Sequence, residues 1–130
     1  MQPPVVPRRP VILLVDDDAD TLEMYELGLS AGGFSPTGIR DGTSVARHVD
    51  TVRPDAVVTD LQLHGTTGWG VMQSLKQHAA GRGIPVVLLT GYSNPDIDRQ
   101  AREFGCAAVL TKPCSPDDLA AVLWRVLTVA

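Results

Sequence analysis

The chain has 130 residues, of which 44% are hydrophobic and 20% charged, the balance of an ordinary globular domain with one core. Its formal net charge of −4 lacks the basic excess of most nucleic-acid-binding domains, so we expect no direct nucleic acid binding. No apolar run is long enough to span a bilayer, and no apolar h-region of a signal peptide follows Arg8 and Arg9, so we expect neither a membrane span nor a signal peptide. Cys106 and Cys114 form no CxxC pair, which indicates reduced thiols in a cytoplasmic protein, without a metal or redox role.

The first ten residues hold four prolines, and such a segment stays extended and contributes little to a core. We interpret residues 1–10 as a tail or linker and residues 11–130 as one domain.

Five apolar runs within residues 11–130 are typical of strands. Val11–Val15 and Ala56–Thr59 are continuous apolar or β-branched runs, as expected for strands buried on both faces. Phe34–Ile39 is weaker, because Pro36 removes a backbone donor, so this strand is expected at an edge of the sheet. The five expected strands are residues 11–15, 34–39, 56–59, 84–90 and 107–111.

Helix signals separate these runs. Asn94-Pro95-Asp96 combines an N-cap, a first-turn proline and a first-turn acid, and Ser115-Pro116 begins a second such signal. Asp18 and Asp20 are interpreted as cap and first-turn acids of the first helix. The expected helices run from about residue 18 to 32, from 41 to before 54, from a loop with Gly65 and Gly68 to about 80, from 95 past 104, and from 116 to about 127.

Five alternating strand–helix units predict an α/β fold. We expect a (βα)5, doubly wound, five-stranded parallel sheet in the flavodoxin-like order 2-1-3-4-5, with helices on both faces. Ligands of such sheets bind beyond the carboxyl ends of the strands.

Acidic residues, a hydroxyl and an amine follow the predicted strands. Asp16 and Asp17 follow the first strand, Asp60 the third, Thr90 closes the fourth, and Lys112 follows the fifth. Crowded carboxylates repel each other, and Mg²⁺ (or Mn²⁺) relieves this repulsion through hard oxygen ligands while leaving room for phosphate oxygens. The pattern predicts a metal-dependent phosphoryl site in which one carboxylate is the nucleophile.

A family resemblance follows from these residues. Val15-Asp16-Asp17, Asp60, Thr90-Gly91 and Lys112-Pro113 stand at the strand ends as they do in response regulator receiver domains, the CheY-like superfamily of two-component phosphorelays. Each motif alone is weak, but the four together form a specific signal. The chain resembles that family over residues 11–128.

The resemblance implies a role for each acidic residue. Asp60 is the expected phospho-acceptor. Asp17 is the expected direct Mg²⁺ ligand, while Asp16 acts through water. Gln62 stands where the family offers a backbone carbonyl to the ion.

It also implies roles for three other residues and for the partners. Lys112 holds the acceptor and then the phosphoryl oxygens, Thr90 turns its hydroxyl onto the phosphoryl group, and Gly91 leaves room for it. The donor is a sensor histidine kinase or a histidine phosphotransfer protein, and the downstream target is unknown. The protein is not a turnover enzyme. Its output surface is the fourth helix, fifth strand and fifth helix, in a monomer or weak dimer.

Several positions depart from the family pattern. The usual switch aromatic, three residues before the lysine, is Val109, which leaves the switch mechanism open. The usual proline four residues after the acceptor is His64, a possible extra ligand or gate but most simply a solvated loop residue. Tyr92, two after the threonine, is large enough to obstruct an attacking water, which predicts slow autodephosphorylation. Ala107 and Ala108 replace acidic residues of a common dimer face and disfavour that dimer.

The last helix carries an unusually uncharged second side. Ala120, Ala121 and Trp124 lie beside its core face, and we interpret them as a partner surface.

Other functions remain as alternatives. A flavodoxin-like cofactor binder needs a Ser/Thr/Gly-rich phosphate loop after the first strand, where this chain has three aspartates. A haloacid-dehalogenase-type phosphatase needs its nucleophile at the first strand, together with a cap domain. The main alternative is a receiver-like interaction module with weak or no phosphorylation. The sequence does not separate a stand-alone regulator from a receiver of a hybrid kinase or larger regulator.

Overall fold

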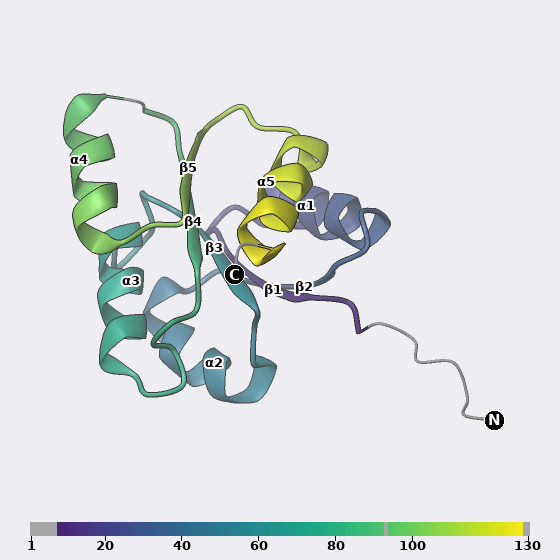
Figure 1. The fold of residues 1–130 in the computed structure, drawn as a ribbon, viewed down its shortest axis with the longest axis horizontal. Coiled ribbons are helices and arrows are strands. Elements are labelled where there is room, and N and C mark those ends of the chain that lie inside the picture. Colours follow the sequence, from purple (N-terminus) through teal and green to yellow (C-terminus); the bar gives the residue numbers. More distant parts are fainter. Residues whose placement is uncertain (1–7, 93, 129–130) are drawn as a thin grey trace.

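The structure is a computed structural model that describes residues 8–92 and 94–128. A single parallel sheet crosses the domain in the order β2-β1-β3-β4-β5 (Figure 1). This order confirms the predicted fold class. The strands are β1 (Val11–Val15), β2 (Ser35–Ile39), β3 (Ala56–Asp60), β4 (Val86–Thr90) and β5 (Ala108–Thr111).

Helices cover both faces of the sheet. The helices are α1 (Ala19–Ala31), α2 (Val45–Val52), α3 (Gly68–Gln77), α4 (Pro95–Phe104) and α5 (Pro116–Thr128), with a 3₁₀ turn at Gly42–Ser44. In Figure 1, α1 and α5 lie on one side of the sheet, and α2, α3 and α4 lie on the other.

The alternating directions of strand side chains build a core on each face. In β1, Ile12 and Leu14 pack under α1 and α5, whereas Leu13 and Val15 pack under α2 and α3. All four side chains are buried, and burying one such chain stabilises the fold by about 1.5–3 kcal/mol. The continuous apolar run of β1 therefore reflects burial on both faces.

The edge position of the Pro36 strand is confirmed. β2 pairs only with β1 among the described strands, and Pro36 lies in register with Ile12. The strand begins at Ser35 rather than at Phe34. The backbone N–H of Phe34 instead donates to the Leu29 carbonyl (3.0 Å), which closes the turn after α1, while its ring is buried in the core.

The predicted helix caps are confirmed for α1 and α4. The Asp18 side chain accepts from the backbone N–H of Thr21, and that of Asn94 accepts from Ile97. The second helix differs from expectation, because the Asp41 carboxylate accepts from both the N–H (2.9 Å) and the hydroxyl (2.6 Å) of Thr43. These two bonds tighten the first turn into a 3₁₀ turn, after which α2 begins.

Other boundaries differ by a few residues. The third helix ends at Gln77 rather than near residue 80, and the fourth strand begins at Val86 rather than at residue 84. Residues 1–7 of the expected tail lie outside the described residues.

The interpretation of the last helix as a partner surface is wrong for Ala120, which is buried against the end of α1. The ring of Trp124 packs on Phe34 with centroids 4.4 Å apart, and its indole N–H donates to the Gly32 carbonyl (3.3 Å). A Cβ on Gly28 would lie 2.2 Å from the Cβ of Pro116, so glycine is required for this close approach. Ala121 and Trp124 are exposed, so for these two residues the partner surface stays a prediction.

Among the described residues, no helix combines the length and apolar character that crossing a membrane requires.

Candidate functional site

The carboxyl ends of the central strands bring the predicted acidic residues together. Asp16 and Asp17 follow β1, and Asp60 is the last residue of β3. One carboxylate oxygen from each of the three lies within 4.8 Å of the others. No other group of three His, Cys, Asp or Glu side chains comes this close within the part of the chain that the structure describes.

The ammonium group of Lys112 bridges two of these carboxylates. Its Nζ atom donates to Oδ2 of Asp60 (2.9 Å) and to Oδ2 of Asp16 (3.2 Å). Burial alone would lower the pKa of Lys112, but the hydrogen bond to Asp60 and the two negative charges outweigh it and raise that pKa above 10.5. Lys112, which follows β5, is therefore a fixed cation beside the last residue of β3.

The two aspartates after β1 have different surroundings. Asp16 is buried, and its oxygens accept from the backbone N–H of Asp18 (2.9 Å) and from Lys112. Asp17 is more exposed, and its Oδ2 atom contacts His64 through the backbone N–H and through Nδ1, both at 3.1 Å. Arg40 holds the backbone of Asp17 by donating to its carbonyl (3.0 Å). Asp17 thus keeps more freedom to bind an added ligand than Asp16.

The loop after Asp60 packs tightly against the acceptor strand. The backbone N–H of Gln62 lies 3.3 Å from Oδ1 of Asp60, and Gln62 pairs with Thr67 to close the loop. Gly68 donates its N–H to the Leu61 carbonyl (2.7 Å), and a Cβ on Gly68 would lie 2.8 Å from the Asp60 carbonyl oxygen. Gly68 therefore lets α3 begin directly beside the acceptor.

Sequence reasoning missed this role and placed Gly68 only in a loop. The available signal was the preceding Thr67, whose hydroxyl accepts from the Gly70 N–H and caps α3. A cap at Thr67 would have placed Gly68 at the first helical position.

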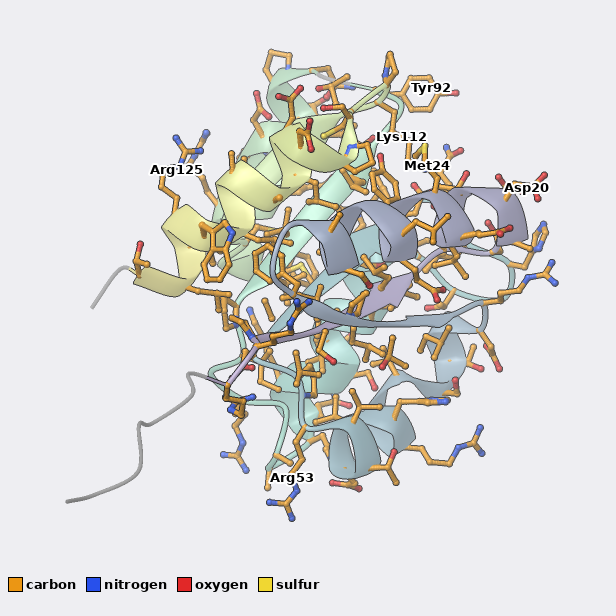
Figure 2. The ribbon with its side chains drawn as sticks, turned by 90° about the vertical axis from the view of Figure 1, so that its right-hand side faces the viewer. Asp20, Met24, Arg53, Tyr92, Lys112 and Arg125 are labelled. Carbon is orange, nitrogen blue, oxygen red and sulfur yellow. The ribbon has the colours of Figure 1, made fainter. Side chains whose placement is uncertain are left out.

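Thr90 ends β4, the strand next to β3. Thr90 is buried, and its Oγ1 atom accepts from the backbone N–H of Tyr92 (3.1 Å). Gly91 is exposed, and the space where a Cβ would lie is open. Figure 2 shows Tyr92 and Lys112 at the same end of the molecule.

Two positions that depart from the family pattern differ in their surroundings. Val109 packs against a small apolar cluster of Leu61, Leu88 and Ile97. His64 has an exposed ring, as expected for a loop residue, yet the ring contacts the carboxylate of Asp17.

The donor set fits a hard divalent cation. Three carboxylates converge, and Lys112 contributes one positive charge beside them. Clustered carboxylate oxygens with open access for water suit Mg²⁺ or Mn²⁺. Asp16, Asp17 and Asp60 are the side chains that would hold such an ion.

The cysteines lie apart from this cluster. Burial raises the pKa of Cys106 to about 11 and also raises the pKa of Cys114, so both thiols are poor nucleophiles near neutral pH.

Comparison with known proteins identifies the family. The model of the family described as "Response regulator receiver domain" matches residues 12–123. The chain is 37% identical over 110 residues to the DNA-binding response regulator MtrA of Mycobacterium tuberculosis (strain CDC 1551 / Oshkosh), covering 85% of this chain and 47% of that protein. It is 33% identical over 116 residues to the phosphate regulon transcriptional regulatory protein PhoB of Escherichia coli (strain K12), covering 89% of this chain and 51% of that protein.

Solved structures share the fold. The chemotaxis response regulator CheY4 of Vibrio cholerae has a TM-score of 0.84 at 23% identity, covering 92% of this chain and 99% of that one. The signal receiver domain of a signal transduction histidine kinase from Syntrophus aciditrophicus has a TM-score of 0.80 at 30% identity, covering 92% and 90% of the two chains.

The chain belongs to the response regulator receiver domain family of two-component systems. It spans about half the length of the curated relatives that it matches.

Proposed function

We propose that the chain accepts a phosphoryl group on Asp60, in a reaction that requires Mg²⁺, from a sensor histidine kinase or a histidine phosphotransfer protein. The observation that carries this proposal is the position of Lys112, whose Nζ atom bridges Asp60 and Asp16 beside the third carboxylate, Asp17. An acceptor oxygen, a fixed cation and a divalent-ion site thus meet within one cluster.

Each residue has a chemical task in this reaction. A carboxylate oxygen of Asp60 attacks the phosphorus of a phosphohistidine, the P–N bond breaks, and its electron pair returns to the imidazole nitrogen. Lys112 neutralises charge on the phosphoryl oxygens, and the Thr90 hydroxyl donates to one of them. A bound Mg²⁺ would supply further charge neutralisation. Asp17 would bind the ion directly, Asp16 would act through water, and the backbone carbonyl of Gln62 would be a further ligand.

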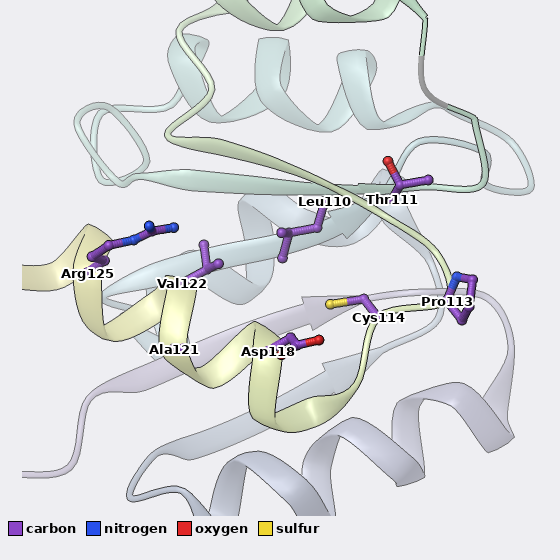
Figure 3. A pocket seen from close by; sticks show the side chains of 8 residues that line it. All are labelled: Leu110, Thr111, Pro113, Cys114, Asp118, Ala121, Val122 and Arg125. Carbon is purple, nitrogen blue, oxygen red and sulfur yellow. The ribbon is translucent and has the colours of Figure 1, made fainter.

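The acyl phosphate is then lost to water, so the domain is labelled once per cycle and is a signalling module rather than a turnover enzyme. Reorientation of Thr90 toward the phosphoryl group shifts the populations of the α4-β5-α5 surface. That surface includes the groove between β5 and α5 in Figure 3, which is lined by Leu110 of β5 and by Asp118, Val122 and Arg125 of α5. We propose that it contacts a protein target in the cytoplasm, as a monomer or weak dimer, and that residues 11–130 form this receiver.

Intact-mass measurement after incubation with Mg²⁺ and acetyl phosphate tests the proposal. The parent should gain the mass of one phosphoryl group, and the gain should be absent without Mg²⁺ and in Asp60→Asn. Asp20→Asn, which removes an exposed carboxylate outside the cluster, is the matched control and should label like the parent. Labelling of Asp60→Asn at another residue would overturn the assignment.

Val109 favours a second candidate, a receiver-like interaction module that switches weakly or not at all. The Val109 side chain packs in an apolar cluster and offers no ring to follow Thr90. Absence of labelling by both acetyl phosphate and a panel of histidine kinases, with Mg²⁺ still bound, would favour this module.

A further inference from the structure

The side chain of Tyr25 joins α1 to the turn that carries Lys112. Its ring is buried in the core between the sheet, α1 and α5, and its hydroxyl donates to the backbone carbonyl of Cys114 at 2.7 Å. We propose that this bond makes Tyr25 a positioning residue, which fixes the turn after β5 and thereby holds the ammonium group of Lys112 against Asp60. The inference rests on the proposed function only for the task of Lys112 at the phosphoryl group.

The turn between β5 and α5 is held on both sides of the Lys112 side chain. The backbone N–H of Lys112 donates to the Thr90 carbonyl at 2.7 Å, which ties the start of the turn to β4. Two residues later, the Cys114 carbonyl accepts from the Tyr25 hydroxyl, which ties the turn to α1. One bond to the sheet and one bond to α1 therefore set the direction in which the Lys112 side chain leaves the backbone.

The hydroxyl of Tyr25 is not needed to fill space. A buried hydroxyl costs free energy unless it is hydrogen-bonded, and a phenylalanine ring would fill the same volume without that cost. Tyr25 is 3% exposed and belongs to an apolar cluster. Burial raises the pKa of Tyr25, so the phenol keeps its proton and donates it to the carbonyl. The oxygen of Tyr25 therefore specifies where the turn lies.

The place of the turn matters because the Lys112 side chain is long. A flexible four-carbon stem carries its ammonium group, yet Nζ lies 2.9 Å from Asp60 and 3.2 Å from Asp16. A loose turn would spread the Nζ atom over several positions, and a misplacement of about 1 Å can cost about 100-fold in rate. Loss of the Tyr25 hydroxyl is therefore expected to slow the labelling of Asp60 while the reacting groups stay the same.

Nuclear magnetic resonance of the lysine side chains tests the placement directly. The chain has two lysines, Lys76 and Lys112, so ¹³C-labelled lysine gives one signal from the site and one internal reference on α3. Tyr25→Phe keeps the ring and removes the hydroxyl. Without Mg²⁺ or a phosphodonor, ¹³C relaxation at Cε should show a lower order parameter for Lys112 in Tyr25→Phe than in the parent, and no change for Lys76. An equal order parameter for Lys112 in the two proteins would overturn the proposal.

Labelling kinetics test the consequence. At saturating Mg²⁺ and acetyl phosphate, the maximal rate of Asp60 labelling should fall about 10-fold in Tyr25→Phe, and Tyr25→Phe should cause no further loss in a Lys112→Gln background. Trp124→Phe is the matched control, because it removes an indole N–H that donates to the Gly32 carbonyl (3.3 Å) at the other end of the contact between α1 and α5. This control should label at the parent rate.

An equal loss of rate in Tyr25→Phe and Trp124→Phe would overturn the proposal, because it would reflect general loosening of the contact between α1 and α5. The same fold loss with and without Lys112 would overturn it too, since Tyr25 would then act by another route. The relaxation measurement needs no phosphodonor, so a parent that fails to label would contradict the proposed function and leave the test of Tyr25 intact.

Discussion

The Nζ atom of Lys112 lies 2.9 Å from Oδ2 of Asp60, although Asp60 ends β3, Lys112 follows β5, and the two residues are 52 positions apart. The same nitrogen also reaches Asp16 at 3.2 Å. A single ammonium group thus relieves part of the repulsion among the three carboxylates, because it pairs with two of them. A divalent ion would share this task.

Replacing Lys112 by glutamine should therefore make the fold more dependent on Mg²⁺. Without the ammonium group the three carboxylates repel each other, and an ion that binds only the folded state restores stability. Thermal unfolding with and without saturating Mg²⁺ measures the effect, and the rise in Tm should be larger in Lys112→Gln than in the parent. Lys76→Gln, a change far from the cluster, should leave that rise unchanged. An equal or smaller rise in Lys112→Gln would contradict the prediction.

The residues that could be predicted from sequence are those whose signals are local. The apolar run of β1, the cap at Asn94 and the placement of Asp60 at a strand end each depend on a few neighbouring residues. Because parallel strands end at one edge of the sheet, their terminal residues meet once the fold class is known. The carboxylate cluster could therefore be predicted from the sequence alone.

The contacts that sequence did not predict join distant segments. His64 and Asp17 are 47 residues apart, and their contact depends on the conformation of the loop after β3. Ala120 is buried because Gly28 of α1 and Gly32 after it let α5 approach, and no local pattern in α5 reveals this. Such contacts depend on how helices pack, which the pattern of one helix does not determine.

An aromatic contact links α3 to α4 on the face opposite to α1. The rings of Trp69 and Phe104 stack with centroids 5.1 Å apart and planes at 23°, and Nζ of Lys76 lies 5.3 Å from the Phe104 ring. A double-mutant cycle of Trp69→Leu and Phe104→Leu, measured by urea unfolding, should give a coupling free energy of about 1 kcal/mol, the typical value for such a pair. Trp124→Leu combined with Phe104→Leu should be additive, because Trp124 packs on the other face. A coupling near zero for the first pair would mean that the stacked rings act independently.

The ring of Tyr92 is predicted to slow the loss of the phosphoryl group. The backbone N–H of Tyr92 donates to Oγ1 of Thr90, so Tyr92→Ala keeps that hydrogen bond and removes only the ring of a residue that is 59% exposed. After removal of the donor, the labelled mass should decay several-fold faster in Tyr92→Ala than in the parent, because water then reaches the acyl phosphate more easily. Tyr92→Phe keeps the bulk and should decay at the parent rate. An unchanged rate in Tyr92→Ala would exclude shielding by the ring.

Asp55 holds the start of β1 by hydrogen bonds and makes the stability of the fold depend on pH. Its Oδ2 atom accepts from the backbone N–H of Val11 (2.7 Å), and its two oxygens pair with the Arg8 guanidinium (2.9 and 3.0 Å). The hydrogen bond from Arg8 lowers the pKa of Asp55, and the hydrogen bond from Val11 lowers it further. Together they outweigh the effect of burial, which raises the pKa, so the pKa of Asp55 lies below 3.8. A carboxylate whose folded pKa is depressed stabilises the fold fully above its unfolded pKa, and this contribution is lost as the pH falls through the folded pKa.

Asp55→Asn should therefore cost stability at neutral pH but not in strong acid. We expect a loss of up to about 1 kcal/mol at pH 7, the range of a partly exposed ion pair. In urea unfolding from neutral pH downward, the gap in unfolding free energy between parent and variant should narrow only below about pH 3.8, where the unfolded parent takes up the proton on Asp55 before the folded parent does. Glu23→Gln, which removes an exposed carboxylate of α1 outside its first turn, should show no such narrowing. A gap that stays constant through the acid range would mean that the charge of Asp55 contributes nothing and that only its hydrogen-bonding oxygens hold β1.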